Sequence, residues 1–416
     1  MENLVTPARL VSRRWFLAGT AATVAALAGC SSSSSSSGDS TPAATASAGG
    51  SATAGSVAAL AQAFYKTLDA DLQSAVLLDY SLAYAKRWSN LPQALIGGGG
   101  GGAPGGSGSG GPSGGPPSGG NQSGTPSGGP PSGSSSQSGG TGGSGSSARV
   151  GINMGQLNND QLAALDAVLK AATGTATGLG YEQIQAQLAA DDYLADNGGG
   201  DSYGRENYYV ALLGSPQDSG TWEFQFGGHH LAVANTYTDG KLAGATPSFR
   251  GVEPNGDFEQ DGTTYNVMGV KEAAFTAMLA GLSSDQLASA KLADSYTDLV
   301  LGPGQDWAFP TDREGVQVST LSAESKKLVL AAIATYVDDI TDADAKTILA
   351  KYEGELDDTY LAYSGTTKLT ERNDYVRIDG PSAWIEYSMQ GGIVLSGNHP
   401  HTVWRDRSTD YGGTKS

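Results

Sequence analysis

The chain has 416 residues, a formal net charge of −18 and a single cysteine, Cys30. The acidic balance argues against binding to nucleic acid and against docking of the protein surface on anionic lipid. One cysteine also excludes a disulfide bond within the chain.

The first thirty residues have the pattern of a bacterial targeting signal. Ser12–Leu17 reads SRRWFL, which matches the twin-arginine export pattern, and the apolar run to Ala28 is too short to span a bilayer. The run ends in LAGC at Leu27–Cys30, the pattern of a lipoprotein site. We therefore predict that residues 1–30 are a twin-arginine lipoprotein signal. Lipid on Cys30 would anchor the exported protein to the outer face of the cell membrane and would be its only membrane contact. An incidental or buried cysteine is the alternative.

Two tracts contain almost no hydrophobic residues. Residues 31–56 are rich in Ser, Ala, Gly and Thr and cannot bury enough apolar surface to offset their ordering entropy, which predicts a flexible tether. Residues 97–147 are rich in Gly, Ser and Pro and carry no charge, which predicts a disordered insert. This insert could span part of a cell wall, or it could be a tolerated loop expansion.

The remaining sequence contains an internal repeat. Three segments recur in the same order: Ala63–Asp79 as Ala274–Asp294, Arg149–Asn158 as Arg313–Ser322, and Tyr209–Phe224 as Tyr375–Tyr387. We interpret them as two copies of one unit, residues 57–245 and 268–412, joined by a connector at 246–267, with residues 97–147 inserted in the first copy. The period is far longer than that of a short solenoid repeat, which favours two units related by a pseudo-twofold axis.

Each unit begins with helices and ends with strands. Apolar residues at helical spacing predict a helix from Val57, one after the N-cap Asn158 or Ser322, and one near Tyr181–Leu188 or Asp342–Tyr352. A period of two then predicts strands at Tyr208–Leu213, Thr221–Phe226 and Leu231–Thr238, and at Asp374–Ile378, Ala383–Met389 and Ile393–Leu395. Helices followed by hairpins, twice over, predict an α+β fold with an antiparallel sheet.

All four histidines lie in two short motifs. His229 and His230 occur in WEFQFGGHHLAVAN, and His399 and His401 occur in GNHPHTVWRD. Histidine is the commonest protein ligand for transition metals, so two tight clusters favour a metal site. The alternative is that the histidines satisfy buried hydrogen bonds at a strand turn.

Strand geometry limits which of these side chains can meet. Neighbours on a strand face opposite sides, so His229 and His230 could share a pocket only at a bulge, for which the two preceding glycines are suitable. His399 and His401 face one side of an extended segment, and Pro400, which lacks an N–H, predicts an edge strand or a loop there. One histidine of the first pair with both of the second gives three imidazoles. That is the ligand count of an open zinc, iron or copper site, with zinc favoured.

Charged residues in the same motifs could complete a catalytic site. Glu223 and Glu386 occupy matching places in the repeat and are candidate general bases, metal ligands or partners of a ligand histidine. A solvated charge on a strand is the alternative for each. Arg250 and Arg405 are candidates to bind an anionic substrate, because an arginine fork fits carboxylate and phosphate. For them the alternative is a structural ion pair, as between Arg405 and a neighbouring aspartate.

Three stretches carry a resemblance to a known family: Trp222–Leu231, Thr246–Pro254, and His399–Asp406 followed by Asp410–Gly412. They resemble a family of bacterial exported proteins catalogued as domain of unknown function 3500. The resemblance covers the chain from about Val57 to Gly412, without the Gly-rich insert that most members lack. It implies no established activity or substrate, so the function must be argued from the residues.

Two hypotheses follow for the function. The first is an enzyme, a metal-dependent hydrolase, that works outside the cytoplasmic membrane on a cell-wall component or a small anionic substrate. The second is a non-catalytic extracytoplasmic protein that binds a metal or a cell-wall glycan. The sequence contains no serine-hydrolase elbow, no HExxH motif, no P-loop and no dinucleotide fingerprint.

Overall fold

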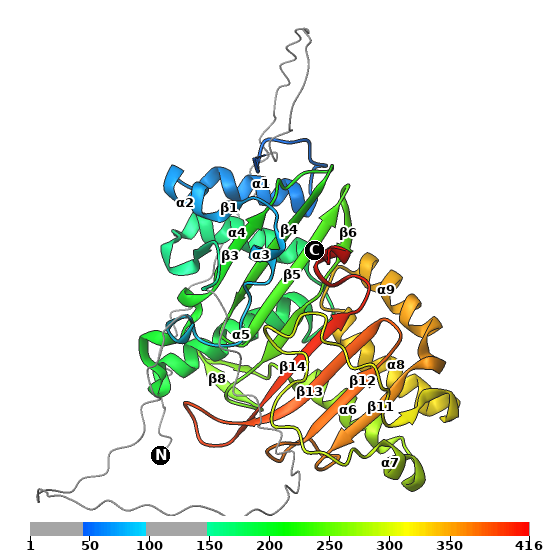
Figure 1. Ribbon diagram of the computed structural model, residues 1–416. Coiled ribbons are helices and arrows are strands. Elements are labelled where there is room, and N and C mark those ends of the chain that lie inside the picture. The colour runs from blue at the N-terminus through cyan, green and yellow to red at the C-terminus, as the bar shows by residue number, and fades with distance from the viewer. Residues whose placement is uncertain (1–44, 97–147, 416) are drawn as a thin grey trace, which may run out of the picture. The chain divides into compact units, whose positions relative to one another are not determined.

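The computed structural model describes residues 45–96 and 148–415 (Figure 1). Over these ranges the fold is α+β, as expected, with nine α-helices and a large, mostly antiparallel sheet. The predicted signal at 1–30, the first part of the predicted tether and the insert at 97–147 lie outside the described residues. No helix within the described ranges combines the length and the apolar character needed to cross a membrane.

The helices begin where the sequence provides caps. Asn158 accepts hydrogen bonds from the N–H groups of Asp160 and Gln161, and Ser322 accepts one from Ser325, so both predicted N-caps are confirmed. The nine helices are α1 Val57–Thr67, α2 Ala70–Val76, α3 Leu82–Ala85, α4 Asn159–Ala172, α5 Gly180–Leu194, α6 Gly269–Ala280, α7 Ser284–Ala290, α8 Ala323–Val337 and α9 Asp342–Gly354.

Twelve strands form the large sheet. They are β1 Leu77–Leu78, β2 Ile152–Asn153, β3 Tyr209–Leu213, β4 Thr221–Gly228, β5 Leu231–Thr238, β6 Lys241–Gly244, β7 Ser248–Gly251, β10 Val316–Gln317, β11 Tyr360–Ser364, β12 Tyr375–Asp379, β13 Ala383–Gly391 and β14 Asn398–Asp406. The main path runs β1-β3-β4-β5-β7-β14-β13-β12-β11-β10, with β2 beside β3 and β6 beside β5. A separate hairpin joins β8 Phe258–Gln260 to β9 Thr263–Tyr265.

Alternation along the strands gives the sheet two different faces. On one face, residues such as Phe226 and Ile385 pack against the long helices, on which Leu165 and Ile333 are buried. On the opposite face, Phe249, Ala232 and Val403 form a smaller cluster with α3 and with Trp88. Residues 291–312, which contain no helix or strand, also lie on this second face, and we call them the cover segment.

The two halves of the sheet join where β7 pairs with β14. Because β14 also pairs with β13, it is an interior strand, and the predicted edge strand is wrong (Figure 1). The Pro400 carbonyl accepts a hydrogen bond from Val252, so the Pro400 nitrogen faces the same side, where β7 has just ended. The β7–β14 hydrogen bonds end before the Pro400 nitrogen, so no partner strand needs an N–H from this residue. An interior strand can therefore contain this proline.

Two other expectations are corrected. Ile393–Leu395 is not a strand, because its three N–H groups donate to the carboxylate of Glu253 and form a loop. The end of the predicted tether is not free either. Ala46 N–H donates to Asp79, and Gly50 O accepts from the side chain of Gln62, so residues from 45 onward bind the folded part.

The order of elements recurs along the chain. β2, α4 and α5 precede β3, and β10, α8 and α9 precede β11. β2 pairs with β3, and β10 pairs with β11. Gly151 and Gly315, just before β2 and β10, both have positive φ, and a Cβ on either would lie 2.0 Å from a carbonyl oxygen of the neighbouring strand. Glycine is required at both places by the same close backbone approach.

Candidate metal centre

His229 and His230 form the two-residue turn between β4 and β5. Gly228 still pairs with Leu231, so the strand register is unbroken and the bulge that would let both side chains share a pocket is not present. His230 instead has a φ of 62°, the left-handed conformation that reverses the chain. The two side chains make different contacts. His230 faces β14, whereas Nδ1 of His229 lies 2.6 Å from the Asp191 carboxylate near the end of α5.

Arg149 holds this turn in place. Its buried guanidinium donates to the carbonyls of Gly228, Ser89 and Leu91, each at 2.7 Å. The Asn90 carbonyl accepts the N–H of His230 at 3.1 Å. Burial lowers the pKa of Arg149 to about 10, which still leaves it charged at neutral pH. The sequence marked Arg149 only as part of the repeat.

β14 supplies the other two histidines. His399 and His401 lie on the same strand face, as their spacing predicted, with Pro400 between them. Gly251 of β7 lies beside His401, and a Cβ at this position would come within 3.0 Å of the His401 ring and 3.1 Å of the His230 ring. A glycine in β7 is therefore what allows the turn and β14 to approach each other.

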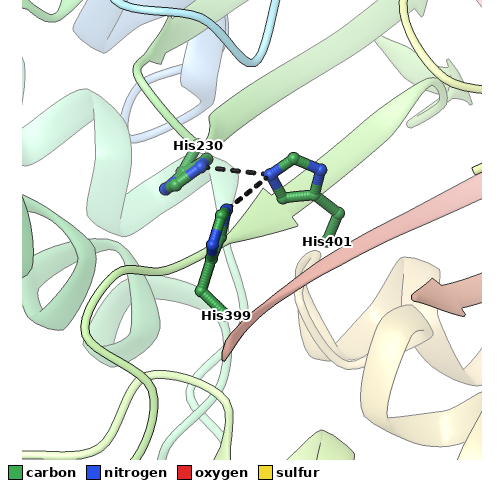
Figure 2. Close-up of side chains that lie close together, drawn as sticks. All are labelled: His230, His399 and His401. Atoms are coloured by element: carbon green, nitrogen blue, oxygen red, sulfur yellow. Dashed lines mark hydrogen bonds between the residues drawn. The ribbon is translucent and has the colours of Figure 1, made fainter. Parts of the chain in front are cut away.

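The three imidazoles of His230, His399 and His401 converge on one point (Figure 2). Nε2 of His401 lies 3.1 Å from Nε2 of His399 and 3.1 Å from Nε2 of His230. All candidate ligand atoms lie within 4.8 Å of one another, and the residues are only 2, 1 and 6% exposed in the order 230, 399, 401. The cluster could hold a metal ion.

Proton counting tests the hydrogen-bond alternative. His401 Nδ1 lies 3.3 Å from the Asp298 carboxylate, which requires the proton on Nδ1 and leaves one lone pair on Nε2. That single lone pair would then have to accept N–H groups from both other histidines. Their Nδ1 atoms have no hydrogen-bond partner, whether they are acceptors in this arrangement or N–H donors when Nε2 binds a metal, so these atoms favour neither interpretation. A cation at the point of convergence would instead accept all three lone pairs, so the residues fit a metal better.

The protonation state also suits a metal. Burial and the neighbouring histidines lower the pKa of His230 well below its ordinary value and that of His399 to about 2. Both are therefore neutral at physiological pH, the form that binds metals.

His229 supports the centre from outside. Its ring stacks on His230 with centroids 3.7 Å apart and meets the edge of Tyr203 at 4.8 Å. Since Asp191 holds Nδ1, the structure selects His230 rather than His229 as the partner of His399 and His401.

The structure does not bring either predicted glutamate into contact with the histidines. Glu386 is fully buried and accepts the N–H groups of Val300 and Leu301, both at 2.9 Å, and the hydroxyl of Tyr375. Glu223 is also fully buried and accepts from Gln225 and Thr236. Burial raises the pKa of both carboxyls, to about 7 for Glu223.

Both predicted substrate-binding arginines are engaged inside the fold. Arg250 points to the helical face, where it donates to three oxygens of the sheet and lies 3.5 Å from Asp339. Arg405 is fully buried and bonds to Asp410 and Asp306. These contacts match the structural-pair alternative, and they leave neither fork open to an anionic ligand.

The cover segment provides a residue that the sequence did not single out. Asp298, which contacts His401, lies in a stretch without periodicity or motif, and only the fold brings it to β14. Burial raises the pKa of this carboxyl, but its interaction with His401, above all the hydrogen bond, outweighs that effect and lowers the pKa.

These features define an α+β protein with a buried three-histidine cluster that could hold a metal ion. The chain belongs to the family described as "Protein of unknown function (DUF3500)", whose model matches residues 144–413. The resemblance seen in the sequence is thus confirmed, over a range that leaves out residues 57–96. No curated protein and no solved structure matched the chain.

Proposed function

We propose that the protein is an extracytoplasmic metalloprotein that holds one divalent transition-metal ion on Nε2 of His230, His399 and His401. The observation that carries this proposal is the convergence of the three nitrogens, two of the spacings being 3.1 Å. Bonds of 2.0–2.1 Å to one ion separate its nitrogen ligands by about 3.3 Å in a tetrahedral site.

The spacing favours no single metal. An octahedral ion with three ligands on one face would separate the nitrogens by about 2.9 Å at the same bond length, so 3.1 Å lies between the two geometries. We favour zinc, and iron and copper also suit an imidazole set.

The enzymatic form of the proposal is a hydrolase. A divalent ion with three protein ligands and an open position supplies Lewis-acid chemistry for hydrolysis. Because Glu223 and Glu386 bond elsewhere, the candidate proton-transfer residue is His229, whose Nδ1 is held by Asp191 and whose ring touches His230. The Asp191 carboxylate would keep His229 oriented, as in other carboxylate–histidine pairs.

One observation favours the non-catalytic alternative, a metal-binding protein. The ligand residues are at most 6% exposed, and four pockets in the described part of the chain, beside Trp88, Lys326, Trp222 and Asp192, are lined by other residues. Catalytic centres usually open into a cleft that admits a substrate. For glycan binding, the tryptophans of the same motifs, Trp222, Trp384 and Trp404, are buried and offer no stacking surface.

Metal analysis of the purified full chain tests the common part of both forms. We expect one zinc, iron or copper ion per chain, removable by a strong chelator. A panel of ester, amide and phosphate substrates, assayed with and without chelator, then separates the two forms. Chelator-sensitive turnover supports the hydrolase, and a loaded protein without turnover supports the binding protein. Metal content far below one per chain after incubation with each ion and dialysis would contradict the proposal.

We also propose that the protein is exported by the twin-arginine route and held at the outer face of the cell membrane by lipid on Cys30. The support is the sequence pattern at residues 1–30. A route that carries folded proteins agrees with a buried metal centre. The partner that fits this location is a cell-wall component or a small anionic molecule, and not nucleic acid, given the net charge of −18.

We further infer that the fold contains two copies of one unit, residues 57–245 and 268–412, with a connector at 246–267. Strand pairing supports this. In one half of the sheet, the strand register can be followed residue by residue from the pair Ile152–Val210 across β4 and β5 to Ser248 in β7. In the other half, the same steps lead from the pair Val316–Leu361 across β12 and β13 to Trp404 in β14. Ser248 and Trp404 are therefore equivalent positions. These two residues pair with each other across β7 and β14, as residues beside a pseudo-twofold axis should.

The same counting corrects the predicted match of the glutamates. It makes Tyr375 the equivalent of Glu223 and Ala234 the equivalent of Glu386, because β3 corresponds to β11 rather than to β12. The third sequence match is therefore displaced by one strand. The residue equivalent to His230 is Ser382, so the histidine cluster occurs once and not in each copy.

A further inference from the structure

Asp298 is placed to control the orientation of one ligand. Its Oδ1 lies 3.3 Å from Nδ1 of His401, on the side of the ring away from the other histidines, which Nε2 faces. Asp298 cannot be a ligand to the same ion from that side. A carboxylate on the outer nitrogen of a ligand histidine fixes its tautomer and ring orientation and raises its basicity.

We infer that Asp298 is the outer carboxylate partner of the metal centre and that the cover segment, residues 291–312, closes the centre and retains the ion. The inference rests on the proposed metal site and adds the residue that positions it. His401 is the ligand on which such a partner matters most. Its Nε2 makes both 3.1 Å approaches, and Nδ1 of His230 and His399 has no hydrogen-bond partner.

Hydrogen bonds to Glu386 and Arg405 hold the cover segment at Val300 and Leu301. Glu386 accepts the N–H groups of Val300 and Leu301, and Arg405 donates to the Leu301 carbonyl at 3.3 Å. Arg405 and the Tyr411 hydroxyl also bind Asp306 further along the segment. Glu386 and Arg405, expected from the sequence to act on a substrate, thus hold the segment that carries Asp298. Because neither bonds to the three histidines, Glu386 and Arg405 are positioning residues.

Exposure indicates where the ion enters and leaves. The Asp298 side chain is 49% exposed, whereas the three ligand residues are almost fully buried. Gln390 on β13 donates to both Asp298 and Ser388, so Asp298 is the exposed member of a polar group that reaches the His401 ring. If Asp298 moved away from His401, the ligand ring would become more exposed to solvent and would lose the contact that fixes its orientation.

The test compares metal retention in variants of the full chain. Zinc affinity is measured by competition with a chromophoric chelator, zinc release by stopped flow, and ligand geometry by the absorption spectrum of the cobalt-loaded protein. Asp298→Ala should weaken zinc binding roughly 10- to 100-fold, accelerate release and shift the cobalt spectrum. Asp298→Asn, which keeps an acceptor but loses the charge, should give intermediate values. Glu386→Gln, which loses one of its acceptor oxygens, should accelerate release with little change in the spectrum.

Asp294→Ala is the matched control, because Asp294 is an exposed aspartate of the same cover segment. It should behave like the wild type. If the wild type retains none of zinc, cobalt, iron and copper, the proposed function fails and the inference with it. If it retains iron or copper but not zinc, the same variants are compared with that ion. If the wild type binds both ions and Asp298→Ala and Asp298→Asn match it in affinity, release and spectrum, the inference alone is overturned. Should the alanine variant fail to fold, the asparagine variant decides the matter by the same measurements.

Discussion

Nε2 of His230 lies 3.1 Å from Nε2 of His401, although the two residues are 171 positions apart in sequence. The order of strands explains this meeting, because β5 and β14 both pair with the short strand β7. The N–H of Gly251 at the end of β7 donates to the carbonyl of His230, and Gly251 pairs with His401. The centre therefore exists only where the two halves of the sheet join, and an ion bound there would stabilise that junction.

The first prediction separates the ligands from their neighbour. His230→Ala, His399→Ala and His401→Ala should each retain less than about a tenth of the metal content of the wild type after dialysis, because two imidazoles bind an ion far more weakly than three. His229→Ala should retain most of it, since His229 bonds to Asp191 instead. Metal per chain is measured by mass spectrometry of the digested protein. Equal loss in the His229 variant would contradict the assignment of His230.

The second prediction concerns the approach of the two halves. Gly251→Ala adds a Cβ that would lie 3.0 Å from the His401 ring and 3.1 Å from the His230 ring, closer than ordinary van der Waals contact. The rings must move apart by a few tenths of an ångström. We expect metal affinity to fall by about tenfold without removal of any ligand, and the cobalt spectrum to change. Gly354→Ala, at the end of α9, where φ is not positive and no atom lies near the added Cβ, tests for a general effect of such substitutions. Wild-type affinity in Gly251→Ala would show that the centre tolerates a wider separation.

Local patterns predicted much of the fold. Helix starts at Asn158 and Ser322 were readable because a capping side chain and an apolar period occur together in a few residues. The spacing of His399 and His401 predicted a shared face because a strand alternates with a period of two. These inferences need only neighbours in sequence.

Contacts between distant segments were not readable. Pro400 indicated an edge strand, since nothing local shows that β7 ends where the proline begins. The Gly-Gly pair before the histidines suggested a bulge, whereas close packing of Gly228 on Tyr208 and an ordinary turn explain it. The sequence around Asp298 contains no motif that indicates a role, because Asp298 meets His401 only through the path of the cover segment to β14. On the proposed repeat Glu223 does not match Glu386, because similar hairpins follow one another along the chain and the sequence match falls on the wrong one.

The third prediction concerns the anchor. Cys30→Ala should leave the protein without lipid, because the chain has no other cysteine. Labelling with a radioactive fatty acid should then fall to background, and the protein should move from the membrane fraction to the soluble fraction. Cys30→Ser serves as a second, smaller change at the same place. Membrane fractionation of both variants that equals the wild type would refute lipid anchoring through this residue.

The last prediction uses the buried carboxyl of Glu223. Burial raises its pKa to about 7 in the folded protein, against 4.5 for an ordinary glutamate. Below pH 4.5 the carboxyl is protonated in both states and contributes no pH dependence. As pH rises from 4.5 to 7, the unfolded chain releases this proton while the folded protein keeps it, so the free energy of unfolding falls. Above pH 7 the loss is complete and constant.

Glu223→Gln removes this titration and keeps the shape of the side chain. In the wild type the free energy of unfolding should decrease between pH 5 and pH 8, and in the variant this decrease should be smaller by about 2 kcal/mol. The figure follows because a shift of one pKa unit corresponds to about 1.4 kcal/mol. Urea denaturation at the two pH values measures it. Glu259→Gln, a change at an exposed glutamate of β8, should leave the difference unaltered. If the two variants show the same pH dependence as the wild type, Glu223 is ionised in the fold at low cost, and its bonds to Thr236 and Gln225 stabilise the carboxylate rather than the acid.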